Sequence, residues 1–184
     1  MLDASTFKNQ DLINLAKENF INLKIDAESE YGNKLFTQFN GAGYPLIIFL
    51  DKDGVELDRF YGYIPAYEFI LKMNNVIEGK NTLSDYLDQY NLGNHSAELL
   101  KPLADKYREK GNNKKAIQLY SELIKSANIS KESFISSKYY IASLSLKNNE
   151  STLMEEYLNQ FENSAKFENG VYDLINYYKS NQME

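Results

Sequence analysis

The chain has 184 residues, enough for one medium-sized domain or two small ones. Its formal net charge of −6 argues against a nucleic-acid partner and against an anionic membrane surface, because both favour clustered lysine and arginine. It contains no cysteine, which excludes disulfides, thiolate metal sites and cysteine nucleophiles.

The sequence also lacks the usual signatures of membrane, metal and cofactor binding. No apolar run approaches the roughly 18 residues that a membrane span needs, and residues 1–7 do not have the pattern of a signal peptide. His95 is the only histidine, and its position in the turn-like stretch Asn94-His95-Ser96 favours a surface or capping role over a metal site. No phosphate-binding loop, nucleophile elbow or metal-ligand helix motif is found. We therefore expect no metal and no cofactor.

The first part of the chain alternates helical and strand patterns. Apolar residues at helical spacing predict a helix over residues 11–19, and the β-branched run from Phe20 to Asp26 predicts a strand. A short helix is expected over residues 29–39, where the large apolar side chains fall on one side. Gly41-Ala42-Gly43 then ends it.

A hairpin and a longer helix follow. The continuous apolar run from Pro45 to Leu50 is typical of a strand covered on both faces. Asp51-Lys52-Asp53-Gly54 predicts a turn, and the alternation over residues 55–60 predicts an antiparallel partner strand. Pro65 suits the first turn of a helix that reaches about Glu78.

The pattern changes after Gly79. Helical stripes recur near residues 99–107, 116–124, 153–161 and 171–178, and no convincing strand pattern follows. We therefore divide the chain into a mixed α/β region over residues 1–80, a linker with a short helix over residues 81–95, and an all-α region over residues 96–184.

The first region resembles the thioredoxin-like proteins of the thiol–disulfide oxidoreductase superfamily. The resemblance rests on Thr6-Phe7 with Asp11-Leu12-Ile13, on the strand Phe20–Asp26, on the loop Gly43-Tyr44-Pro45, and on the block Phe49–Gly54 with Arg59–Tyr63 and Pro65-Ala66. It implies an α/β thioredoxin-like fold with a mixed sheet that is incomplete at its N-terminus.

The family's first strand and its Cys-x-x-Cys motif have no counterpart in this sequence. In the family, that strand lies between the strands that correspond to residues 20–26 and 45–50. The resemblance therefore implies thiol–disulfide exchange or redox homeostasis in a presumed longer parent, while this cysteine-free chain is expected to be inactive. Each buried backbone group left unpaired costs about 1–3 kcal/mol. We thus expect strand 20–26 to shift toward another strand, or something else to fill the slot.

The resemblance places substrate or peptide contact at Gly43, Tyr44 and Pro45, and it assigns no catalytic residue here. In the family this loop holds a cis-proline, and the backbone of the residue before it pairs with an extended substrate. The Tyr44–Pro45 bond is therefore expected to be cis. The alternative is that Pro45 only opens a strand, where its missing N–H is harmless.

The second region resembles tetratricopeptide repeats. The resemblance is carried by small and aromatic residues at the intervals of the repeat, namely Leu100, Leu103, Ala104, Tyr107, Gly111, Ala116 and Tyr120. It implies one repeat over about 96–130, a poorer one over 131–163, and a capping helix over about 166–179. A generic helical bundle is the alternative.

A second function is open if the chain is taken as complete. It would then be a non-catalytic adaptor that binds peptides or a partner protein through the thioredoxin-like edge and the helical repeats. Both functions imply a protein or peptide partner. The compartment stays open between the bacterial periplasm, for a parent that has lost a signal peptide, and the cytoplasm.

Overall fold

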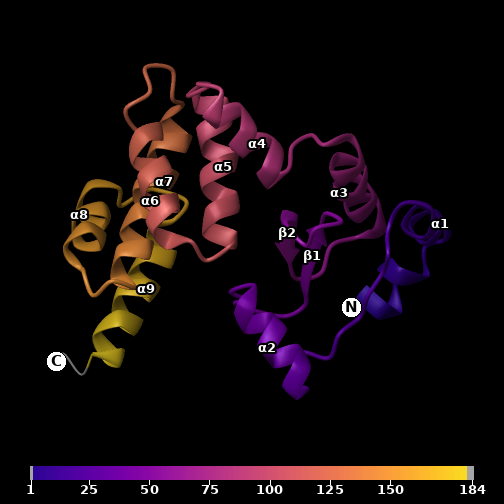
Figure 1. Ribbon diagram of the computed structural model, residues 1–184. Helices are drawn as coiled ribbons and strands as arrows, with labels where there is room; N and C mark the ends of the chain where they lie inside the picture. Colours follow the sequence, from indigo (N-terminus) through magenta and orange to yellow (C-terminus); the bar gives the residue numbers. More distant parts are fainter. Residues whose placement is uncertain (1, 182–184) are drawn as a thin grey trace. The chain divides into compact units, whose positions relative to one another are not determined.

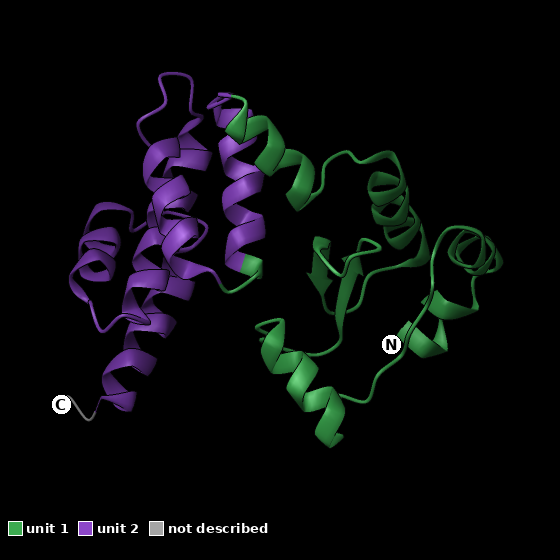
Figure 2. Cartoon of the chain, viewed as in Figure 1, with its two compact units in different colours: residues 1–92, 109–111 green, residues 93–108, 112–184 purple. Residues whose placement is uncertain are grey.

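A computed structural model describes residues 2–181 of the chain (Figure 1). Over this range the chain is mainly α-helical, with one two-stranded sheet. It divides into two compact units (Figure 2). Unit 1 consists of residues 1–92 with 109–111, and unit 2 consists of residues 93–108 with 112–184.

Unit 1 holds both strands and the helices of the first half of the chain. In chain order its elements are the 3₁₀ turns η1 (Leu2–Ala4) and η2 (Thr6–Lys8), the helices α1 (Gln10–Asn19) and α2 (Glu30–Gln38), the strands β1 (Leu46–Leu50) and β2 (Glu56–Tyr61), and the helices α3 (Ala66–Glu78) and α4 (Leu83–Asn91).

The predicted thioredoxin-like α/β fold is wrong. That fold needs a mixed sheet in which residues 20–26 form a strand, whereas the described residues contain only the antiparallel pair β1–β2. Residues 20–26 have no regular secondary structure. The physical reason is that a strand is held by its ladder of hydrogen bonds, and β-branched residues alone do not form one. The hairpin and helices α1 to α3 do form where their patterns predict them.

The core of unit 1 is formed by the hairpin together with helices α1 and α3. Phe60 packs edge-on against Phe69 with ring centroids 5.1 Å apart, and Phe49 lies 6.4 Å from each of these rings. Leu12 of α1 and Met73 of α3 are buried beside them. Such aromatic pairs contribute about 0.5–1.5 kcal/mol each beyond the area they bury, so this cluster fixes the hairpin on the helices.

Three helices of unit 1 begin at a side chain that caps the first turn. Asn9 accepts a hydrogen bond from the N–H of Leu12 at the start of α1, Ser29 accepts one from Gly32 in α2, and Thr82 accepts one from Asp85 in α4. Each cap of this kind stabilises a helix by about 1 kcal/mol. The helix boundaries are therefore encoded locally.

Unit 2 is all-helical over the described residues, in agreement with the all-α prediction. Its helices are α5 (Ala97–Glu109, whose last residue is grouped with unit 1), α6 (Asn113–Leu123), α7 (Lys131–Leu146), α8 (Thr152–Gln160) and α9 (Phe167–Ser180). Helix α7 packs against α6, α8 and α9, so it is the central helix of the unit.

Two polar networks join the helices of unit 2. The Tyr120 hydroxyl of α6 donates to Asp105 of α5 at 2.5 Å, and the Arg108 guanidinium of α5 lies over the Tyr140 ring of α7. In α7, Tyr139 and Ser143 both donate to the Asp173 carboxylate of α9, at 2.8 and 2.9 Å. These bonds satisfy hydroxyls that would otherwise be costly to bury.

Candidate functional site

The two edges of the hairpin differ in what lies beside them. Helix α4 packs against β2. On the other side, no strand within residues 2–181 pairs with β1, so the sheet ends there. An unpaired edge presents a row of N–H and C=O groups that can accept another strand. This edge is the candidate functional site.

The register of the hairpin identifies the backbone groups that face the open edge. The Gly62 N–H donates to the Pro45 carbonyl at 2.9 Å, and Ile47 and Phe49 stand opposite Phe60 and Asp58. Hydrogen-bonded pairs alternate along an antiparallel ladder, so Ile47 and Phe49 direct their backbone groups toward β2. The N–H and C=O groups of Leu46 and Ile48 therefore point to the open edge.

The stretch from Phe20 to Asp26 is the second feature of the site. It runs without regular structure between α1 and α2 (Figure 1). The Phe20 ring packs 5.6 Å from the Phe49 ring of β1, which fixes the start of the stretch beside the core. Beyond that point the side chains of Ile21, Leu23 and Ile25 are 93 %, 79 % and 45 % exposed. Such a run of exposed apolar side chains is typical of a surface that a partner covers.

Local contacts hold this stretch at both ends. The Asn22 amide donates to the carbonyl of Ala16 at the end of α1. At the other end, the Ser29 hydroxyl donates to the Asp26 carbonyl at 2.6 Å and accepts from the Gly32 N–H. Lys24 forms an exposed ion pair with Asp3, at 2.9 Å. The exposed apolar side chains therefore belong to an anchored segment.

The residues predicted to contact a substrate, Gly43, Tyr44 and Pro45, lie directly before β1. The Tyr44–Pro45 peptide bond is cis, as expected. The Tyr44 side chain is 60 % exposed, and its ring stacks on Phe36 of α2 at a centroid distance of 4.7 Å. The structure thus brings the three predicted residues to the end of the open edge.

A buried ion-pair cluster lies on β2 and was not predicted. The Arg59 guanidinium donates two hydrogen bonds to the Glu56 carboxylate, at 2.7 and 2.6 Å, and Lys110 approaches the same carboxylate at 3.2 Å. The side chains of Arg59 and Glu56 are only 1 % and 4 % exposed. In a regular strand, residues three apart point to opposite faces, so the sequence does not predict this pair. A β-bulge in β2 brings the two side chains together.

The electrostatics of this cluster favour the charged forms. Burial alone would raise the pKa of Glu56. The hydrogen bonds and the positive charge of Arg59, with a smaller contribution from Lys110, outweigh that effect and hold the pKa of Glu56 below its usual value of 4.5. All three groups satisfy one another, so the cluster has a structural role and offers no free acid or base.

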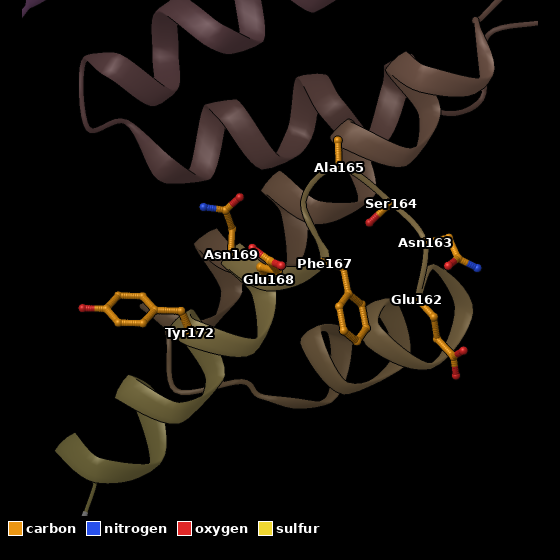
Figure 3. A pocket seen from close by; sticks show the side chains of 8 residues that line it. All are labelled: Glu162, Asn163, Ser164, Ala165, Phe167, Glu168, Asn169 and Tyr172. Atoms are coloured by element: carbon orange, nitrogen blue, oxygen red, sulfur yellow. The ribbon is translucent and has the colours of Figure 1, made fainter.

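The described residues offer little else for chemistry. They contain no group of three or more histidine, aspartate or glutamate side chains that could hold a metal ion. None of the described helices is long and apolar enough to cross a membrane. A hollow of about 510 Å³ lies at the turn between α8 and α9 in unit 2. Its side chains do not converge on one point, and Tyr172 points away from the others (Figure 3).

No protein-family model, curated protein or solved structure matches the chain. Neither the thioredoxin-like nor the tetratricopeptide resemblance therefore gains support from a relative. The function has to be argued from the geometry of the open edge.

Proposed function

We propose that this chain is a non-catalytic binding protein, and that unit 1 takes up an extended polypeptide by strand addition at the open edge of β1. The observation that supports the proposal is the row of outward-facing backbone groups of Leu46 and Ile48. Strand addition uses such groups for affinity, and it uses alternate side chains of the ligand for specificity.

Three neighbouring features favour this function. The core fixes β1 through Phe49, so the edge is presented by a rigid element. The exposed Tyr44 ring stands at the start of the strand, where an aromatic face can cover a bound peptide. The exposed apolar side chains of residues 21–25 supply further surface to bury.

The thiol–disulfide function stays a prediction that rests on the thioredoxin-like resemblance alone. The present chain has no cysteine that could form a mixed disulfide. A tetratricopeptide-like contribution of unit 2 to partner binding likewise stays a prediction.

The test is a titration of the ¹⁵N-labelled protein with an uncharged peptide, Val-Thr-Val-Thr-Val with acetylated and amidated ends. We expect the amide signals of Leu46 and Ile48 to shift and their hydrogen exchange to slow. Those of Ile47 and Phe49 are already protected by β2 and keep their exchange rates. A control peptide with proline in place of the central valine lacks one ladder donor and binds more weakly. Failure of the first peptide to perturb Leu46 and Ile48 would refute the proposal.

A further inference from the structure

The excess of negative over positive charge lies entirely in the first half of the chain. Residues 1–92 carry 14 aspartate and glutamate side chains and eight lysine and arginine side chains, whereas residues 93–184 carry 12 of each. The whole net charge of −6 therefore lies in residues 1–92. An excess of one sign on one part of a protein raises the encounter rate with partners of the opposite sign.

The carboxylates of Asp26, Glu28 and Asp51 form no ion pair with a lysine that the structure describes. The exposed stretch ends at Asp26, and the Glu28 carboxylate that follows has no ion-pair partner among the described residues. Asp51 directly follows β1, and its carboxylate accepts hydrogen bonds from backbone N–H groups of the hairpin turn. The nearby cations are already occupied, because Lys24 pairs with Asp3 and Lys52 with Asp53.

We infer that the strand bound at the open edge belongs to a basic partner polypeptide, with apolar side chains at alternate positions and lysine or arginine at its ends. The apolar side chains cover Ile21, Leu23 and Ile25, and the cationic ends lie against Asp26, Glu28 and Asp51. The inference rests on the proposed strand addition and names the chemistry of its ligand. Two observations support the inference together: the apolar strip formed by the exposed side chains of Ile21, Leu23 and Ile25, and the carboxylates that form no ion pair.

A second copy of this chain is the less favourable occupant. Pairing two β1 edges would bring together two units of net charge −6, and like charges at an interface oppose association. A basic partner gains from the same charges.

The experiment compares three peptides on the full chain by isothermal titration calorimetry. All contain Val-Thr-Val-Thr-Val, flanked on each side by two glycines, two lysines or two glutamates. We expect the lysine-flanked peptide to bind about fivefold or more tightly than the glycine-flanked one, and the glutamate-flanked peptide to bind more weakly than both. At about 1 M salt, where the screening length is only about 3 Å, the three affinities converge.

Two matched leucine variants test the apolar strip. Leu23 and Leu92 are 79 % and 87 % exposed, so replacing either with lysine leaves folding intact, which circular dichroism verifies. Leu92 lies at the end of α4, outside the proposed surface. We expect Leu23→Lys to lower the affinity for the lysine-flanked peptide at least about fivefold. Leu92→Lys is expected to change that affinity less than twofold.

The outcomes separate the two levels of the proposal. Equal binding of the three peptides, with shifts at Leu46 and Ile48, would leave the strand addition standing and overturn the basic partner. Equal effects of the two leucine variants would overturn the role of the apolar strip. Self-association of the chain through β1, seen as concentration-dependent sedimentation and lost in a dilute sample, would overturn the basic partner in favour of a second copy. Binding by none of the peptides would refute the proposed function itself.

Discussion

Gly32 of α2 leaves room for the carbonyl oxygen of Asp26. A β-carbon at residue 32 would stand 1.9 Å from that oxygen, which no side chain can do without moving the backbone. The same carbonyl accepts the Ser29 hydroxyl, and Ser29 in turn caps α2. The end of the exposed apolar stretch is therefore held against the first turn of α2 because residue 32 is glycine.

Gly32→Ala is expected to destabilise unit 1 in spite of the better helix propensity of alanine. Displacing a packed backbone costs about 1–3 kcal/mol, more than the roughly 1 kcal/mol gained in the helix. Thermal denaturation followed by circular dichroism measures the change. Gly43→Ala is the control, because a β-carbon there meets nothing within 4 Å. Similar melting temperatures for the two variants would contradict the prediction.

The stretch around Gly41 allows a second test, at the open edge itself. A β-carbon at residue 41 would lie 2.3 Å from the Phe36 ring, which stacks on Tyr44. We expect Gly41→Ala to displace both rings and to lower the affinity for the valine–threonine peptide. Leu92→Lys, at the end of α4 and outside the proposed surface, serves as control, and we expect it to retain wild-type affinity. The readout is calorimetric titration, with near-ultraviolet circular dichroism to report the tyrosine environment.

The cluster of Glu56, Arg59 and Lys110 predicts a graded loss of stability. Arg59→Leu leaves the buried Glu56 carboxylate without its main partner, and the expected cost is about 3–5 kcal/mol. Lys110→Met removes a side chain that is 32 % exposed, so its cost is smaller, about 1 kcal/mol or less. Urea denaturation measures both. Equal costs would show that the bidentate pair is not the principal interaction.

The same cluster predicts a dependence of stability on acid pH. The pKa of Glu56 is lower in the folded chain than its usual value of 4.5, so the folded state binds this proton less readily than the unfolded state. The stabilisation is therefore present above about pH 4.5 and is lost as the pH falls through the folded pKa. Glu56→Gln is expected to be less stable at pH 7 and to show a shallower loss in acid. An unchanged acid slope in that variant would assign the pH dependence to other carboxylates.

Two adjacent tyrosines of α7 provide a matched pair in unit 2. Tyr139 donates to the Asp173 carboxylate, so Tyr139→Phe is expected to cost about 1.5–3 kcal/mol. Tyr140 contacts Tyr120 and Arg108 through its ring, and Tyr140→Phe keeps that ring, so it costs less than about 0.5 kcal/mol. Guanidinium denaturation distinguishes the two. A larger loss in Tyr140→Phe would contradict the assignment.

Local sequence patterns predicted most helices and strands of unit 1. They could not predict whether residues 20–26 would pair with a strand that is distant in the sequence. Asp51 and Gly54 signal the hairpin turn, and Gly79 ends α3 with a positive φ of 63°. The stretch from Phe20 to Asp26 has the composition of a strand, but a strand forms only beside another one. Its failure to pair overturned the fold class while leaving the neighbouring helices unchanged.

The candidate site was predicted in part. Gly43, Tyr44 and Pro45 came from the resemblance, and the structure places them beside the open edge. The open edge beside residues 45–50 also followed from the resemblance, which leaves the slot next to that strand without a counterpart, whereas no local residue pattern indicates it. The buried pair of Glu56 and Arg59 was also missed, since a bulge brings together side chains that alternation assigns to opposite faces.

The open edge of β1 also governs how the protein behaves in concentrated solution. An apolar strand with one unpaired edge is a template for intermolecular β-pairing, and surface charge keeps colliding molecules apart. That protection is weakest near pH 5.0, the isoelectric point calculated from the amino-acid composition. We therefore expect precipitation to be fastest near that pH and to involve pairing through Leu46 to Leu50, so that storage buffers well above it keep the chain dispersed.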